Sequence, residues 1–384
     1  MNLPIPFNKP FMTGRELSNI AEAHFNGMLA GDGPFTKRCH QLLEARTGAS
    51  KVLLTHSCTA ALEMAALLAD IQPGDEVILP SFTFVSTANA FVLRGAVPVF
   101  VDVRADTFNL DEAQVRARIT PRTRAIVVVH YAGVVCEMDT LCALAREFGL
   151  VVVEDAAQAL LSTYKGRLAG SFGASATFSF HETKNVISGE GGALVLNDPA
   201  LVRRAEIIRE KGTNRSQFFR GEVDKYSWCD VGSSFLPGEL IAAFLWAQLS
   251  DMDAITARRH QLWDRYHQAF QSLESEGHAR RPIIPADCGH NAHMYYLVLP
   301  DLASRTRFIA WLKADGIHAV FHYVPLHRSE FGTQFHRVSA PALPVTDRVS
   351  DCLVRLPMWL GLEEHQARVI DRVIAFFGQD GARP

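Results

Sequence analysis

The chain has 384 residues, of which 48% are hydrophobic and 21% are charged, enough to build one large domain and a smaller one. A net charge of -3 shows no excess of basic residues, so we expect no nucleic-acid partner. Seven cysteines without a CxxC pair indicate a reducing compartment rather than a disulfide framework. The first six residues lack the pattern of a signal peptide, and no stretch is long and apolar enough for a membrane helix. We therefore expect a cytoplasmic protein without a membrane partner.

Short strands and helices alternate through the first half of the chain, after a Pro- and Gly-containing start that ends in the turn Gly31–Pro34. Apolar runs predict strands at residues 52–55, 76–79, 97–101, 125–130, 150–153, 176–180 and 192–197. Amphipathic or Ala- and Leu-rich runs predict helices at residues 36–47, 59–69, 83–93, 140–148 and 201–211. This alternation predicts an α/β fold around a parallel sheet, in which ligands bind beyond the carboxyl ends of the strands.

The second half of the chain no longer shows the regular alternation of short strands and helices. Residues 212–237 form a long polar loop with several aromatic residues, which favours a functional loop. A long helix at 239–273, either straight or bent, then connects to a second domain with strands at 295–299 and 318–323 and helices at 304–314 and 363–377. The predicted division is a large domain over residues 1–250 and a small domain over residues 251–384.

Lys184 is the first candidate for chemistry, because it follows directly after the apolar strand at 176–180. Most lysines are solvated surface charges. A lysine at the end of a buried strand, however, can lose water, lower its pKa and attack a carbonyl. The commonest cofactor that uses such a lysine is pyridoxal phosphate, bound as a Schiff base with an acid facing its ring nitrogen.

Asp155 is the candidate for that acid, since it ends the strand before the predicted site. It could instead only cap the following helix. Beside Asp155, a pyridine nitrogen stays protonated and the ring withdraws electrons from the reacting carbon. Gln158, further along, is placed to meet the oxygen substituent of the ring.

Pyridoxal phosphate also needs a binding site for its phosphate group and an aromatic side chain that stacks on its ring. The run Ser57-Cys58-Thr59-Ala60 lies between a strand and a strong helix, so it offers hydroxyls, free N–H groups and the positive end of a helix dipole, although Ser57 could be only an N-cap. Ser179 could add another hydroxyl. Phe82 and Phe84 are either core residues or the platform on which the ring stacks.

The histidines of the second domain, His318, His322 and His327, fit no zinc spacing. We therefore expect surface or substrate-contacting histidines and no metal site.

Seven short motifs occur in the order typical of one family: PGDEVI (73–78), PSFTF (80–84), GA (95–96), VDV (101–103), EDAAQ (154–158), SFHETK (179–184) and GEGG (189–192). In this ordered set the chain resembles the DegT/StrS family of sugar aminotransferases. The resemblance implies the type I pyridoxal-phosphate transferase fold, similar to aspartate aminotransferase, with a large, mostly parallel-sheet domain and a smaller α+β C-terminal domain. It also implies a homodimer with a shared active site.

Four further stretches resemble the transaminases that form dTDP-4-amino-4,6-dideoxygalactose for enterobacterial common antigen: residues 130–139, 210–221, 230–236 and 320–327. The third stretch departs from the wider family, which mostly has Asn in place of Ser234 and Arg in place of Leu236. That Asn usually reaches the cofactor phosphate of the neighbouring subunit. The subgroup shares the serine, and we expect Ser234 to donate one hydrogen bond there.

The resemblance also implies roles for individual residues. Lys184 would hold the cofactor and then shuttle a proton to the sugar, while Asp155 would pair with the pyridinium nitrogen and Gln158 with the 3-oxygen. Thr59, Ala60 and Ser179 would bind the phosphate, and Phe84 would stack on the ring. The predicted substrate contacts are His181, Asn214, Arg215, Tyr323 and His327.

The implied reaction transfers an amino group from L-glutamate to C4 of dTDP-4-dehydro-6-deoxy-glucose. The alternatives are an aminotransferase acting at C3 or on a UDP-keto-sugar, a sugar dehydratase of the same fold and a non-catalytic regulatory protein. The dehydratases have His at the position of Lys184, and a non-catalytic protein would be expected to lack Lys184 or Asp155. Both alternatives are therefore disfavoured.

Overall fold

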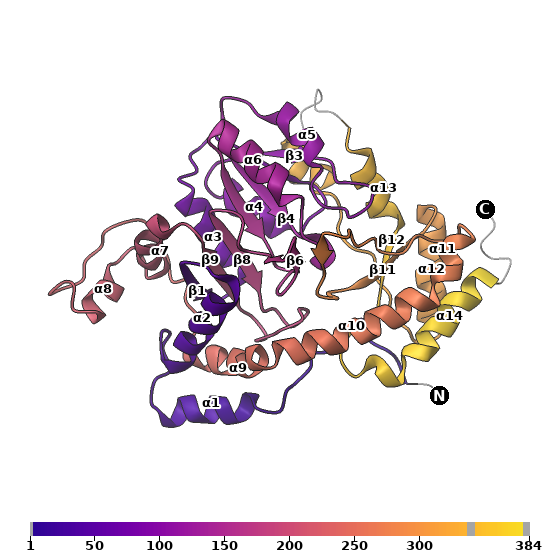
Figure 1. Cartoon of the computed structure of the whole chain (residues 1–384), viewed down its shortest axis with the longest axis horizontal. Coiled ribbons are helices and arrows are strands. Elements are labelled where there is room, and N and C mark those ends of the chain that lie inside the picture. The colour runs from indigo at the N-terminus through magenta and orange to yellow at the C-terminus, as the bar shows by residue number, and fades with distance from the viewer. Residues whose placement is uncertain (1–2, 336–341, 379–384) are drawn as a thin grey trace.

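The computed structural model describes residues 3–335 and 342–378 of the chain (Figure 1). Within these residues a seven-stranded sheet has the order β1-β9-β8-β5-β4-β2-β3. Its strands are β1 (Lys51–Thr55), β2 (Glu76–Pro80), β3 (Val97–Val101), β4 (Thr123–Val129), β5 (Val151–Asp155), β8 (Ser175–Ser179) and β9 (Gly192–Leu196). The predicted α/β fold with a mostly parallel sheet is confirmed.

The direction of the strands decides where a site can form. The pairs β2–β3, β2–β4, β4–β5 and β5–β8 are parallel, while β9 is antiparallel to both β8 and β1. Because β1 and β8 both run opposite to β9, they share one direction. The carboxyl ends of β1, β2, β4, β5 and β8 therefore meet at the same edge of the sheet, which is where such sheets bind ligands.

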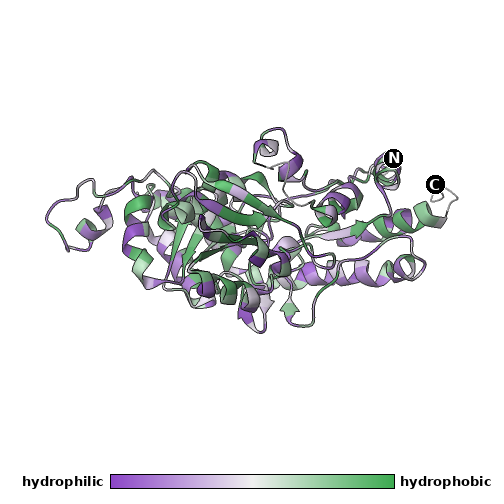
Figure 2. Ribbon diagram, turned by 90° about the horizontal axis from the view of Figure 1, so that it is seen from above, coloured by the Kyte–Doolittle hydropathy of each residue, from purple (hydrophilic) through white to green (hydrophobic). Residues whose placement is uncertain are grey.

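Helices cover both faces of the sheet, whose strands are largely hydrophobic (green in Figure 2). Neighbouring residues of one strand, such as Leu53 and Leu54, belong to different cores because side chains alternate between faces. One face packs against α2 (Pro34–Thr47), α6 (Met138–Phe148) and α9 (Glu239–Ser250). The other packs against α3 (Cys58–Leu68), α4 (Val85–Val92) and α7 (Val202–Arg209).

The later part of the chain builds a separate hydrophobic core, which includes Tyr266, Phe308 and Val354. The elements of this core are α10 (Met252–Ala269), α11 (Gln271–Ser275), α12 (Leu302–Ala314), α14 (Gln366–Gly378) and the antiparallel pair β11 (Tyr295–Val298) and β12 (Leu353–Leu356). Ile5, from the other end of the chain, is buried in the same core and pairs with Ile317. Helix α13 (Pro344–Cys352) packs instead into a smaller cluster that includes Phe82 and Tyr131. The division of the chain at residue 250 stays a prediction.

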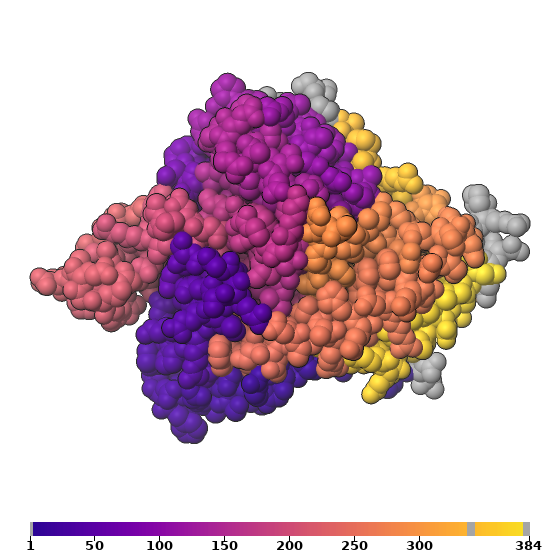
Figure 3. All heavy atoms as spheres, viewed as in Figure 1, coloured from indigo at the N-terminus to yellow at the C-terminus, as the bar shows by residue number. Residues whose placement is uncertain are grey.

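The remaining elements are short. They are α1 (Glu16–Phe25), α5 (Glu112–Val115), α8 (Arg215–Phe219), β6 (Thr163–Tyr164), β7 (Arg167–Leu168), β10 (Cys288–Gly289) and the 3-10 turns η1 (Arg116–Arg118), η2 (Tyr131–Gly133), η3 (Pro199–Leu201), η4 (Leu326–Arg328), η5 (Gly332–Gln334) and η6 (Leu362–Glu364). The segment around α8 projects from the body of the molecule (Figures 1 and 3). No helix of the described residues is long and apolar enough to span a membrane.

Three expectations about secondary structure are wrong. The strand expected at 318–323 does not form, because only Val320 pairs there, through a single bridge to Arg355. The long helix expected at 239–273 is broken at Asp251, whose backbone angles (φ -110°, ψ 9°) are not helical, and again at Phe270. Helix α1 was not expected, although the pattern Thr13-x-x-Glu16 before it is a helix start signal and the Glu16 carboxylate accepts from the Thr13 N–H at 2.7 Å. The helix is stabilised by packing against α9.

Glu154 anchors the loop beside β5 although it is a buried acid. Its carboxylate accepts hydrogen bonds from the backbone N–H groups of Gly170, Phe172 and Gly173 at 2.7–2.8 Å. It also pairs with Nε2 of His130 at 2.9 Å, and Nδ1 of that ring accepts from the Cys136 N–H. Because side chains alternate along β5, this anchor turns the next residue, Asp155, towards the opposite face.

Glu154→Gln should therefore destabilise the fold by about 2–4 kcal/mol, because an amide turns an NH2 group against backbone donors that stay buried. Urea unfolding measures the change. Glu364→Gln, an exposed change in the turn before α14, is the control and should stay within about 0.5 kcal/mol of the wild type. Equal stability of the two variants would contradict the anchoring role.

Candidate active site

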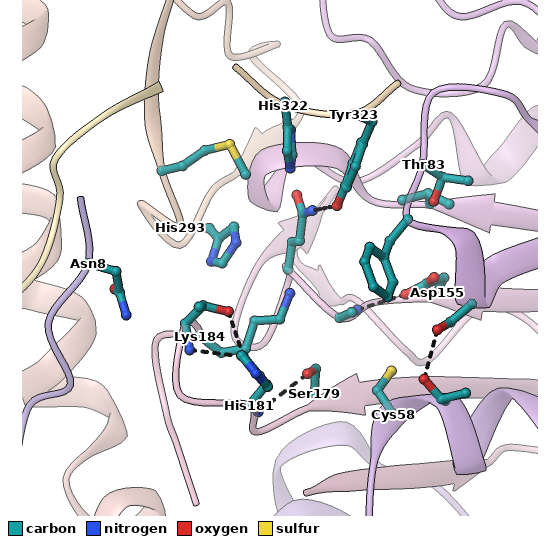
Figure 4. Close-up of a pocket in the computed structure, with 18 of the residues that line it drawn as sticks. Asn8, Cys58, Thr83, Asp155, Ser179, His181, Lys184, His293, His322 and Tyr323 are labelled. Carbon is teal, nitrogen blue, oxygen red and sulfur yellow. Dashed lines mark hydrogen bonds between the residues drawn. The ribbon is translucent and has the colours of Figure 1, made fainter. Parts of the chain in front are cut away.

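A cavity of about 610 Å³ opens at the carboxyl edge of the sheet, and Lys184 lies in its wall (Figure 4). The lysine follows β8 in a tight loop. In this loop the Phe180 N–H donates to the Gly191 carbonyl at 2.9 Å, and the Lys184 N–H donates to the His181 carbonyl at 2.9 Å. The Gly-rich segment thus folds back on the strand end and directs the lysine side chain into the cavity.

The Lys184 amine is prepared for nucleophilic chemistry. Burial lowers its pKa, and the positive charge of Arg355 acts in the same direction, against the opposite effect of Cys58 and Asp155. Among the described residues no hydrogen-bond or ion-pair partner holds this amine. A lysine with a lowered pKa is more often neutral, and the neutral amine is the form that attacks a carbonyl.

Asp155 ends β5 and is buried at the floor of the cavity. Its Oδ2 accepts a hydrogen bond from the Thr87 hydroxyl at 2.6 Å, and its Oδ1 accepts from the Ala157 N–H at 3.1 Å. The Thr87 hydroxyl in turn lies 2.8 Å from that of Thr83. These contacts fix the orientation of the carboxylate at the cavity. Among the described residues no helix lies between β5 and β6, so the alternative that Asp155 only caps a following helix is wrong, and its Oδ1 holds the N–H of a turn instead.

The first turns of α3 and α4 face the cavity together. The Ser57 hydroxyl accepts from the Ala60 N–H at 3.0 Å, so Ser57 is the N-cap of α3. The N–H groups of Cys58 and Thr59 have no hydrogen-bond partner among the described residues. The hydroxyl of Thr59 lies 2.8 Å from that of Ser86, in the first turn of α4. Free N–H groups, paired hydroxyls and a helix dipole suit a phosphate group.

Gly192, at the start of β9, makes this cradle possible. A Cβ atom at Gly192 would lie 2.5 Å from the backbone of both Ser57 and Cys58, closer than any real contact. The absence of a side chain therefore lets the start of α3 approach the strand that follows the Lys184 loop. Burial also raises the pKa of the Cys58 thiol to about 12, so this cysteine stays protonated beside the cradle.

The structure shows which of the two candidate phenylalanines is available to stack on the cofactor ring. Phe82 is buried in the core, with 1% of its surface exposed, whereas Phe84 is 58% exposed and forms part of the cavity wall. Gln158 also lines the cavity: its Oε1 accepts from the Ala132 N–H at 2.7 Å, and its Nε2 donates to the Tyr323 hydroxyl at 2.7 Å. An aromatic face and a fixed amide thus border the space in front of Lys184.

The cavity brings together eight of the predicted site residues: Thr59, Phe84, Asp155, Gln158, Ser179, His181, Lys184 and Tyr323. Ser179 accepts a long hydrogen bond from the His181 N–H, at 3.4 Å, and the His181 ring contacts the Thr183 hydroxyl at 2.9 Å. Ala60 lies in the first turn of α3, where its side chain is in the core and its N–H donates to the Ser57 hydroxyl.

Four predicted residues lie outside the cavity of this chain. Asn214 accepts from the Ser227 N–H at 2.8 Å, and Arg215 stacks on the Phe219 ring. Ser234 pairs with Glu210 in a single bridge. His327 is buried, and its Nδ1 lies 2.7 Å from the Ser81 hydroxyl. The roles expected for these four residues stay predictions.

Several residues of the cavity wall were not predicted from the sequence, namely Asn8, Thr83, Ser86, His293 and Arg355, and His322 was predicted only as a surface or substrate-contacting histidine. Ser86 and Thr83 carry a signal that could have found them, since they flank the start of a helix that follows a strand end. The others come from segments that no strand-end rule connects to the large sheet. His322 stacks on Tyr323 at 3.6 Å between ring centres, and its Nδ1 lies 2.7 Å from the Tyr131 hydroxyl.

Known proteins resemble the chain over most of its length. Residues 10–374 match the DegT/DnrJ/EryC1/StrS aminotransferase family. The chain belongs to this family. Spore coat polysaccharide biosynthesis protein SpsC of Bacillus subtilis is 35% identical over 333 residues, which cover 84% of each chain.

Two solved structures illustrate the similarity in three dimensions. The aminotransferase TlmJ from Streptoalloteichus hindustanus has a TM-score of 0.89 and 29% identity, and the match covers 97% of this chain and 99% of that chain. Spr1654 from Streptococcus pneumoniae, assigned as a sugar aminotransferase, has a TM-score of 0.87 in its PLP form, with 26% identity over 96% of this chain and 97% of that chain. The chain is a sugar aminotransferase that depends on pyridoxal phosphate.

The residues of the cavity fit this cofactor. A phosphate can meet the unpaired N–H groups of Cys58 and Thr59 at the start of α3, which lies close to β9 because Gly192 has no side chain. The exposed ring of Phe84, the oriented carboxylate of Asp155 and the amine of Lys184 border the same cavity. When bound, the cofactor supplies an electron sink that stabilises negative charge on the carbon losing a proton.

Proposed function

We propose that this enzyme transfers the amino group of L-glutamate to C4 of dTDP-4-dehydro-6-deoxy-glucose, giving dTDP-4-amino-4,6-dideoxy-galactose. The observation that carries the amino transfer is the single cavity in which the Lys184 amine, the Asp155 carboxylate and the open start of α3 meet. The choice of sugar and of C4 is supported by the sequence stretches at 130–139, 210–221 and 320–327, which resemble the C4 transaminases.

Each residue of the cavity would have a separate role in the reaction. Lys184 would hold the cofactor, and its amine would then move a proton at C4 of the sugar. Asp155 would keep the ring nitrogen of the cofactor protonated, because a carboxylate held by Thr87 and Ala157 cannot turn away. Gln158 would meet the 3-oxygen, and Phe84 would cover one face of the ring and exclude water from it.

A homodimer with shared active sites is part of the proposal. Asn214 and Arg215 lie at the start of α8, in the segment that projects from the body of the molecule, and Ser234 pairs with Glu210 at the base of this segment. None of the three lines the cavity of its own chain. Exposed aromatic side chains occur in the same segment, among them Phe219 and Trp228, which are 70% and 83% exposed. A second copy that covers these rings would bring this segment towards the partner's cavity, as the family resemblance implies.

The test begins with the visible spectrum of the purified protein before and after the addition of L-glutamate. Loss of the cofactor's absorption band on adding glutamate is the expected result. The protein is then mixed with glutamate and, in separate reactions, a dTDP-4-keto-sugar, a dTDP-3-keto-sugar and the corresponding UDP-sugars, and NMR locates the new nitrogen. An amine at C3, or a preference for the UDP-sugar, would overturn the assignment and favour one of the alternatives.

A further inference from the structure

His293 is a buried histidine of the cavity wall that has no role in the reaction described above; only 9% of its surface is exposed. It lies in the segment before β11, and Arg259 of α10 fixes this segment from behind. The Arg259 guanidinium donates to the Ala292 carbonyl at 3.0 Å and to the His293 carbonyl at 2.6 Å. The imidazole and the Lys184 side chain are directed into the same space (Figure 4).

Two asparagine amides decide which nitrogen of the His293 ring carries a hydrogen. Nδ1 of the ring lies 3.0 Å from Oδ1 of Asn185. The orientation of the Asn185 amide is fixed, because its Nδ2 donates to the Asn291 carbonyl at 2.8 Å and a carbonyl can only accept. Asn291 is itself held, since its Nδ2 donates to the carbonyls of Gln158 and Leu160 at 2.9 Å. The Asn185 oxygen therefore accepts, and Nδ1 of His293 is the donor.

The other ring nitrogen, Nε2, is then a hydrogen-bond acceptor. Burial and the positive charges of Lys184, Arg259 and Arg355 lower the pKa of His293 well below its usual value, so the ring is neutral. A neutral imidazole has a single N–H, which is used at Nδ1, and Nε2 keeps its lone pair. Among the described residues Nε2 has no hydrogen-bond partner. An unpaired acceptor on a buried ring costs free energy that a ligand with a matching donor would recover.

This acceptor distinguishes between the groups that enter the cavity. Carboxylates, phosphates and keto oxygens are acceptors themselves and cannot pair with Nε2. The nitrogen of the amino donor is the reacting group, so it must face the cofactor and not the wall. No hydrogen bond joins the Lys184 amine to the His293 ring among the described residues. The remaining donors are the hydroxyl groups of the sugar.

The position of His293 beside Lys184 selects one of these hydroxyl groups. The charge of Lys184 contributes to the lowered pKa of His293, so the amine and the ring border the same space. Since Lys184 moves a proton at the reacting carbon, a group that reaches His293 at the same time is attached next to that carbon. In a 4-keto-6-deoxy-sugar, C5 bears a methyl group and the ring oxygen, neither of which can donate. C3 bears a hydroxyl.

We propose that Nε2 of His293 accepts a hydrogen bond from the sugar hydroxyl next to the reacting carbonyl, which is the C3 hydroxyl of a 4-keto-sugar. The inference rests on the proposed function and adds a specificity contact to the same cavity. His293 would fix the rotation of the sugar ring, so that C4 faces the Lys184 amine. Asn185 and Asn291 are positioning residues, because they keep the lone pair of Nε2 turned towards the sugar.

The experiment compares two sugars in the holoenzyme: the dTDP-4-keto-6-deoxy-sugar and its analogue without the C3 hydroxyl. In the wild type, the second-order rate constant of the keto-sugar half-reaction should fall about tenfold when this hydroxyl is absent. His293→Asn keeps an NH2 group for the Asn185 oxygen and removes the acceptor beyond it. This variant should react about tenfold more slowly with the complete sugar and should not distinguish the two sugars, because both changes remove the same contact.

The half-reaction with L-glutamate should stay within about threefold of the wild type in His293→Asn, because the donor does not use Nε2. The control His24→Asn changes an exposed histidine of α1 outside the cavity and should keep the full preference for the hydroxyl. His293→Gln, whose longer side chain brings an amide oxygen closer to the position of Nε2, should recover part of this preference.

Binding of an unreactive sugar gives a readout without turnover. Calorimetry with dTDP-6-deoxy-galactose, which has a hydroxyl in place of the reacting carbonyl, and with its 3-deoxy analogue should show about a tenfold preference in the wild type and none in His293→Asn. A His293→Asn variant that still prefers the hydroxyl, or a wild type without this preference, would overturn the inference. Equal losses in both half-reactions would also overturn it, because the ring would then act on Lys184.

These outcomes are separable from the proposed function. A wild-type enzyme that acts at C4, combined with losses that multiply when the variant meets the 3-deoxy sugar, would remove the role of His293 and leave the function intact. A wild-type enzyme that places the amine at C3 would remove the C4 assignment. The same comparison, made with 3-keto-sugars that lack the hydroxyl at C2 or C4, would then decide the role of His293.

Discussion

Lys184→Ala should reduce amino transfer by about four orders of magnitude or more, because it removes both the covalent attachment of the cofactor and the amine that moves the proton. The side chain is the amine directed into the cavity from the end of β8, and no described residue holds it. The expected measurement is a single-turnover reaction with L-glutamate and the keto-sugar, next to a circular-dichroism spectrum that reports the fold.

The matched control for this variant is Lys37→Ala, which changes an exposed lysine of α2. Its turnover should equal that of the wild type. The circular-dichroism spectra of both variants should match the wild-type spectrum, since the Lys184 side chain makes no hydrogen bond or ion pair with the described residues. Turnover in Lys184→Ala close to the wild-type value would refute the assignment of this lysine.

Asp155→Asn should cost the reaction about 3–5 kcal/mol of transition-state stabilisation, which corresponds to roughly 10²–10⁴ in rate. The asparagine has nearly the same shape. Its oxygen can keep the bond from the Ala157 N–H while its NH2 group donates to the Thr87 hydroxyl, which can turn towards Thr83, so the change removes the charge and little else. The neutral amide cannot keep the ring nitrogen of the cofactor protonated. Rate constants for each half-reaction are the measurement.

For this variant Asp371→Asn, an exposed change on α14, is the control and should not alter either half-reaction. A loss below tenfold in Asp155→Asn, about 1.4 kcal/mol, would count against the pairing of Asp155 with the ring nitrogen. In that case the carboxylate would act mainly as a local cap, through its bond to the Ala157 N–H.

The two predictions concern residues that the sequence identifies, whereas the opposite wall of the cavity contains residues that it does not, among them Arg355. Asp155 ends β5 and Lys184 follows the parallel strand β8 of the large sheet, whereas Arg355 belongs to the antiparallel pair β11–β12. The cavity therefore lies between two parts of the chain with separate cores. This placement allows one part to hold the cofactor while the other contacts whichever substrate is present.

The sequence by itself determined the α/β fold and the residues at the ends of its strands. Apolar runs of strand length and the turns between them are local signals, and parallel strands necessarily share their carboxyl edge. For this reason Lys184, Asp155 and Thr59 could be assigned to one site without coordinates. The choice between Phe82 and Phe84 could not be made in this way, because it depends on which ring the start of α4 leaves exposed.

Only the tertiary structure shows which residues form the cavity wall opposite the large sheet. His293, His322 and Arg355 reach the cavity because β11, β12 and the segment before α13 pack against the large sheet, and contacts between distant segments leave no periodic pattern in either one. The same reason explains the strand wrongly expected at 318–323, where a β-like sequence finds a single pairing partner. Local propensity specifies the elements, but the surfaces available when they pack decide which side chains face the ligand.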